Sequence, residues 1–170
     1  MKRSITRAVV YAHPPERVWR ALTDSELLAQ WFMPNDFVPA VGHEFSFRTD
    51  PAPGFDGIVH CQVVEVEAPR RLAYTWRGGP IDTMVSFTLE PVGDGTRLRF
   101  EQTGFEGLKA VLVSYILGGG FAKFYRQLLP AVLERLASNE ADPHVPSAAE
   151  KHKPSAAVTA FAKVIDKLPD

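Results

Sequence analysis

The stretch "HPPERVWRALTDSELLAQWF", residues 13–32, predicts two short amphipathic helices separated by Thr23 and Asp24. Pro14 and Pro15 end the preceding extended segment and favour the first turn of a helix. Asp24 is a typical N-cap residue for the second helix. Helices of this length do not recover their nucleation cost when isolated. We therefore expect both to pack against a larger body that the rest of the chain supplies.

The composition indicates one globular domain. The chain has 170 residues, 45% of them hydrophobic, which suffices for a single well-buried core. Basic and acidic residues number 19 and 20 without a long run of either sign, so we expect no nucleic acid or membrane partner. The longest uncharged stretch, residues 110–122, is too short to span a bilayer. With a single cysteine, Cys61, and no apolar signal segment at the N-terminus, we expect a cytoplasmic protein.

Alternating sequence predicts an antiparallel sheet. Apolar and polar residues alternate in short segments that turns rich in glycine and proline separate, and short breaks favour hairpins. In each segment one face is apolar and the other polar, which predicts burial of a single face. We expect strands near residues 4–12, 42–48, 58–66, 71–77, 81–91 and 96–103.

The pattern becomes helical from Phe121 to Leu136, where apolar residues recur at helical spacing and predict a helix that covers the sheet. Pro130 removes one backbone hydrogen bond, so we expect a kink near residues 126–130. The expected organisation is a domain over residues 1–137, a linker over 138–154 and an amphipathic helix over 155–170.

The last helix carries a narrow apolar stripe formed by Val158, Phe161, Ile165 and Leu168. Such a stripe needs a surface to cover it. The alternatives are docking on its own domain, docking on a second copy of the chain, and a frayed tail, which would leave the stripe unexplained. We favour a homodimer through this tail, because the domain already has a helix over its sheet.

Four motifs lie within these elements: "PPERVWRALTDSELLAQWF", "VGHEFSF", "VVEVEAPRRLAYTW" and "GDGTRLRFEQTGF". With these motifs, the order of the elements resembles the START-like helix-grip (SRPBCC) superfamily, and within it the prokaryotic single-domain type of the family of activators of heat-shock chaperone ATPase homologues. The resemblance covers residues 5–136. It implies an α+β helix-grip fold, in which a curved antiparallel sheet of about six strands wraps around a long C-terminal helix and two short helices close one end. Gly120-Phe121 stands where the family usually has Gly-Trp.

This fold implies a cavity between sheet and helix, and ligand sites are mostly apolar with a few placed polar groups. Gln102 interrupts the apolar series of Leu98 and Phe100, where a purely structural strand would carry a hydrophobic residue. The alternative is that the aromatic residues are ordinary core. The expected cavity residues are Trp31, Phe32, Phe47, His60, Tyr74, Trp76, Phe87, Phe100, Gln102, Phe121, Phe124 and Tyr125.

Motifs for catalysis or cofactor binding are not evident. The five histidines fall at no metal-ligand spacing, so we expect no metal and no cofactor. Cys61 follows His60 directly in a predicted strand, which places their side chains on opposite faces and disfavours a nucleophilic pair. "GGG" at residues 118–120 lacks the following lysine and hydroxyl residue of a phosphate-binding loop.

Three functions therefore stand as hypotheses. The first is a non-catalytic domain that binds a small hydrophobic or amphipathic molecule. The second, which the family resemblance implies, is an interaction module that stimulates a chaperone ATPase. The third is a cavity enzyme of the cyclase or hydrolase type, with His60 and then Tyr74 as candidate acid–base groups. We favour binding over catalysis.

Overall fold

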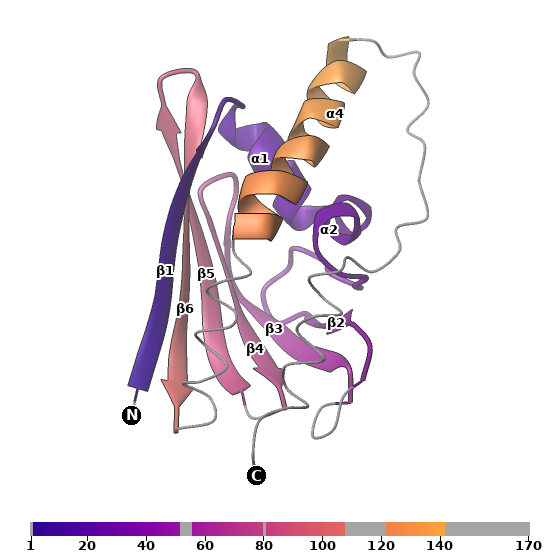
Figure 1. The fold of residues 1–170 in the computed structure, drawn as a ribbon, viewed down its shortest axis with the longest axis vertical. Coiled ribbons are helices and arrows are strands. Elements are labelled where there is room, and N and C mark those ends of the chain that lie inside the picture. Colours follow the sequence, from indigo (N-terminus) through magenta and orange to yellow (C-terminus); the bar gives the residue numbers. More distant parts are fainter. Residues whose placement is uncertain (1, 52–55, 80, 108–121, 142–170) are drawn as a thin grey trace.

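The computed structural model describes residues 2–51, 56–79, 81–107 and 122–141. Six antiparallel strands form one curved sheet in the order β1-β6-β5-β4-β3-β2, and the helices gather on one side of it (Figure 1). This confirms the predicted α+β helix-grip fold. The elements are β1 (Lys2–Tyr11), α1 (Pro15–Thr23), α2 (Ser25–Trp31), β2 (Glu44–Arg48), β3 (Ile58–Glu67), β4 (Arg71–Gly78), β5 (Ile81–Val92), β6 (Gly95–Glu106), the π-type turn η1 (Phe124–Leu128) and α4 (Leu129–Ala141).

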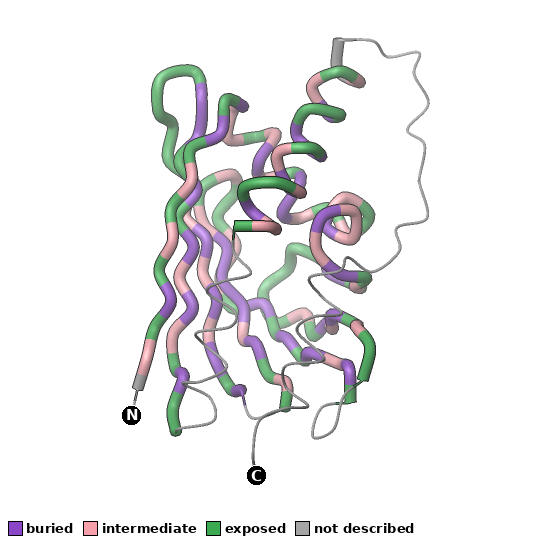
Figure 2. Tube along the Cα trace, viewed as in Figure 1, coloured by how far each residue is buried: buried purple, intermediate pink, exposed green. Residues whose placement is uncertain are grey.

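The strands bury one face, as their alternation predicts. Along β5 the side chains of Val85, Phe87 and Leu89 are buried, and along β6 those of Leu98 and Phe100 are buried. Figure 2 shows the resulting alternation of buried and more exposed residues along the strands. The inner face of the sheet is therefore the face turned toward the helices.

Asp24 creates the corner between α1 and α2. One oxygen of its carboxylate accepts hydrogen bonds from the backbone N–H groups of Glu26 (3.0 Å) and Leu27 (3.1 Å), which caps the second helix. The indole N–H of Trp31 donates to the carbonyl of Ala21 in the first helix at 2.9 Å. Trp31 thus holds the two short helices together while its ring fills the core.

The expected irregularity lies just before Pro130. The backbone N–H of Leu129 reaches the carbonyl of Phe124, one residue further back than in an α-helix. Pro130 has no N–H to offer to the next carbonyl, that of Tyr125. The hydroxyl of Tyr11, at the end of β1, donates to this carbonyl instead. The edge strand is in this way tied to the helix that covers the sheet.

A second set of polar contacts ties His13, between β1 and α1, to both α1 and α4. The buried ring of His13 lies between Arg17 on α1 and Glu134 on α4, with 3.0 Å from its Nδ1 to the guanidinium and 3.0 Å from its Nε2 to the carboxylate. A guanidinium only donates, so Nδ1 accepts and Nε2 carries the hydrogen that Glu134 accepts. His13 also fixes its own backbone, because its carbonyl accepts from the hydroxyl of Thr96 at 2.7 Å.

The helix α4 continues to Ala141, past residue 137 where the domain was expected to end. The linker and the amphipathic tail, residues 142–170, lie outside the described residues, as does Phe121.

Candidate ligand-binding site

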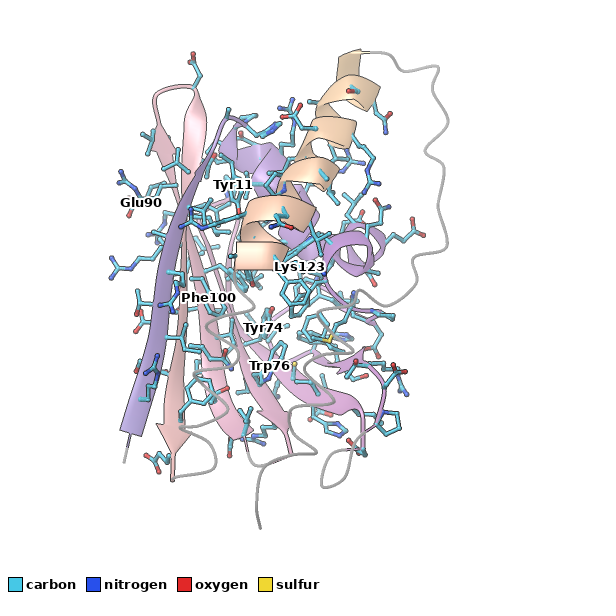
Figure 3. The ribbon with its side chains drawn as sticks, viewed as in Figure 1. Tyr11, Tyr74, Trp76, Glu90, Phe100 and Lys123 are labelled. Atoms are coloured by element: carbon cyan, nitrogen blue, oxygen red, sulfur yellow. The ribbon has the colours of Figure 1, made fainter. Side chains whose placement is uncertain are left out.

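The predicted aromatic residues that the structure describes form one connected cluster between the sheet and the helices. Phe32 is central to it, with ring centroids 5.0 Å from Phe47, 5.8 Å from Trp76 and 5.0 Å from Phe124. The ring of Tyr125 joins the cluster through Trp31, with the two ring centroids 5.2 Å apart. Tyr74, Phe87 and Phe100 continue the cluster across the sheet. In Figure 3 Phe100, Tyr74 and Trp76 lie below Lys123, which precedes η1.

His60 does not belong to this cluster, which corrects its expected place in the cavity. It is exposed, whereas Val59 and Cys61 on either side of it are buried. In the register between β3 and β4, His60 stands opposite Arg77, another exposed residue. Its side chain therefore lies on the outer face of the sheet and cannot serve as an acid–base group in the interior.

Gln102 lies on the inner face, as predicted, and joins a short polar chain. It is 4% exposed, and its Nε2 donates to the hydroxyl of Thr83 at 2.9 Å. That hydroxyl donates in turn to the carbonyl of Trp76 at 3.1 Å. Sequence reasoning missed Thr83, although its position in strand β5, between the inward residues Ile81 and Val85, placed it on the inner face.

Three polar side-chain groups of the inner face receive no partner from the described part of the chain. They are the hydroxyl of Tyr74, the indole N–H of Trp76 and the amide oxygen of Gln102. The indole N–H of Trp31, in contrast, is bonded to the carbonyl of Ala21. Trp31 therefore has a structural role, whereas Trp76 keeps a hydrogen-bond donor available. An apolar interior with a few such groups is the usual composition of a small-molecule site.

Burial keeps the ionisable groups of the interior neutral. Desolvation raises the pKa of Tyr74 well above its ordinary value, and the neighbouring Tyr125 raises it further. Burial likewise raises the pKa of the Cys61 thiol, so the thiolate that a nucleophile needs is disfavoured. Tyr74 therefore acts here as a neutral hydrogen-bonding group.

An open groove of about 520 Å³ lies elsewhere, at the end of the sheet beside the β4–β5 turn. His60 lies in it together with the exposed ion pair of Arg77 and Asp82, whose charged atoms are 3.0 Å apart. Within the described ranges no cluster of histidine, cysteine or acidic residues could hold a metal ion. Nor is any helix among those residues long and apolar enough to cross a membrane.

The family model described as Activator of Hsp90 ATPase homolog 1-like protein matches residues 12–134. The chain belongs to this family. The matched range contains the two-helix corner, strands β2 to β6 and most of the helix over them, and so includes the aromatic cluster and Gln102. None of the curated proteins matches the sequence.

Several solved structures are similar to this chain. Protein MLL2253 from Mesorhizobium loti is 37% identical, with a TM-score of 0.63, over 81% of this chain and 98% of its own. Protein BH1534 from Bacillus halodurans is 27% identical, with a TM-score of 0.66, over 78% of this chain and 99% of its own. DynU16, a putative protein in the dynemicin biosynthetic locus, is 26% identical, with a TM-score of 0.62, over 77% of this chain and 47% of its own.

Proposed function

We propose that this member of the family binds a small hydrophobic or amphipathic molecule between the inner face of the sheet and the segment formed by η1 and α4. One observation carries the proposal: the interior combines a connected aromatic cluster with three polar groups, on Tyr74, Trp76 and Gln102, that no described residue bonds. Burial of the ligand would supply the driving force, at about 25 cal/mol per Å² of apolar surface removed from water. The similarity to a protein of a biosynthetic locus is in keeping with a small-molecule ligand.

The test is a titration with an apolar fluorescent probe, anilinonaphthalene sulfonate. We expect saturable binding that Trp76→Ala weakens more than Trp19→Ala does. Both substitutions remove an indole, but only Trp76 contacts the cluster through Phe32 and Phe47, whereas Trp19 is a partly buried residue of α1. Equal weakening by the two variants, or no saturable binding to the unmodified protein, would reject the site.

A second candidate follows from the family description, which names activation of the Hsp90 ATPase. Such a role needs a docking surface for a chaperone. The exposed large hydrophobic residues of the described chain lie on separate strands and one loop: Val10, Val38, Val41, Val64 and Val92. This dispersion gives weaker support than the interior gives to ligand binding. Measuring the ATPase rate of an Hsp90-type chaperone with and without the protein tests the role directly.

A further inference from the structure

The hydrogen bonds of Gln102 determine which end of its amide meets Thr83. A threonine hydroxyl has one hydrogen, and that of Thr83 is donated to the carbonyl of Trp76. Toward Gln102, 2.9 Å away, the hydroxyl can therefore only accept. The amide must present its nitrogen to Thr83 and turn its oxygen away from it.

Among the described residues, the strand neighbours of Gln102 offer no side-chain donor to that oxygen. Its partners in the strand register are Ile5 on β1 and Val85 on β5, and neither side chain has a polar atom. No described residue bonds the oxygen, although Gln102 is only 4% exposed. An acceptor that lies among apolar side chains gains from a hydrogen bond, so this atom is suited to a partner from outside the chain.

We propose that the amide oxygen of Gln102 accepts a hydrogen bond from the ligand, so that the protein selects apolar molecules carrying a hydroxyl or another O–H or N–H donor. The inference rests on the proposed function and adds to it the chemical class of the ligand. Thr83 is a positioning residue, since it holds the amide in the orientation that presents the acceptor. A site built to receive a donor discriminates against analogues without one.

The experiment compares two fluorescent probes, naphthol and methoxynaphthalene, which share one ring system but differ in the hydrogen that the hydroxyl can donate. The dissociation constant of each is measured with the full-length protein and with Gln102→Met, a residue of similar length without hydrogen-bonding groups. We expect the substitution to reduce the preference for naphthol about tenfold. Comparing the ratio of the two constants cancels the difference in hydration between the probes.

Thr83→Val and Thr83→Ser form a second, matched pair. Valine removes the hydroxyl, so the amide of Gln102 is free to turn its nitrogen toward the methoxy oxygen, and the preference for naphthol should fall. Serine keeps the hydroxyl and should retain the preference. This pair also decides the question if Gln102→Met does not fold.

The outcomes separate the two proposals. A preference that is unchanged in Gln102→Met, or equal in the two Thr83 variants, overturns the role of Gln102 while the binding function stands. Saturable binding of neither probe to the unmodified protein overturns both.

Discussion

The hydroxyl of Tyr11 donates a hydrogen bond to the backbone carbonyl of Tyr125, although 114 positions separate the two residues in the chain. The bond exists because the π-type turn directs the N–H of Leu129 to Phe124 and because Pro130 has no N–H. A local defect in the helix is in this way compensated by the edge strand of the sheet. The same contact fixes the segment that forms one wall of the proposed site.

Tyr11→Phe should therefore lower the free energy of unfolding by about 1–3 kcal/mol, because it removes the buried hydrogen bond that the Tyr11 hydroxyl donates to the carbonyl of Tyr125. Urea denaturation measures the change. In a Pro130→Ala background the helix regains an N–H near this carbonyl, so the same substitution should cost less. An equal cost in both backgrounds would contradict the link between Pro130 and Tyr11.

Asp24→Ala should destabilise the protein by about 1 kcal/mol, because the backbone N–H groups of Glu26 and Leu27 lose their acceptor. Asp24→Asn keeps an oxygen in the capping position and should be close to neutral. Thermal unfolding of the two variants gives the comparison. A loss of the same size in both would mean that the charge, and not the cap, stabilises the corner.

Alkaline pH should destabilise the protein through its buried acids. Burial raises the pKa values of Tyr11, Tyr74, Tyr125 and Cys61. Above the ordinary values of 10.0 for tyrosine and 9.0 for cysteine, the unfolded chain releases protons that the native state retains. The free energy of unfolding is thus unaffected by these groups below about pH 8 and falls as the pH rises beyond it, by about 1.4 kcal/mol per pH unit for each fully titrating group.

Tyr74→Phe isolates one such group, since it removes a single ionisable hydroxyl from the interior. Urea denaturation at several pH values between about 8 and 11 should show a shallower fall for this variant than for the unmodified protein. Parallel pH profiles would mean that Tyr74 ionises as easily in the native state as in the unfolded chain.

The sequence was sufficient to predict the elements because strong local signals mark them. Alternation over β5 and β6 identifies a single buried face, and Asp24 and Pro130 mark a helix cap and a helix irregularity. The placement of His60 could not be predicted in the same way. Strand β3 carries apolar residues on both faces, with Val59 and Val63 on one and Val64 on the other, so only pairing with β4 decides which face is inward.

The polar chain from Gln102 through Thr83 to Trp76 was beyond sequence reasoning for a related reason. These residues lie on three different strands, and their contacts depend on the register and on side-chain rotamers. The sequence did single out Gln102, because a polar residue interrupts an apolar face there. Its partners emerge only from the three-dimensional structure.

The amphipathic tail over residues 155–170 stays a prediction. A chain truncated after Ala141 keeps all of α4 and removes the tail. If the tail mediates a homodimer, light scattering should give a larger oligomer for the full chain than for the truncated one. If both proteins have the same number of chains per particle, a dimer through the tail is excluded.

Ligand binding in the interior is tested most directly by NMR of the indole N–H groups, since the chain has three tryptophans and each gives one signal. The signal of Trp76 is assigned by its loss in Trp76→Phe. On titration with naphthol we predict that this signal shifts most, because its N–H has no partner among the described residues, while that of Trp31, bonded to Ala21, shifts less. An unmoved Trp76 signal, with shifts confined to residues of the outer groove such as His60 and Arg77, would contradict an interior site.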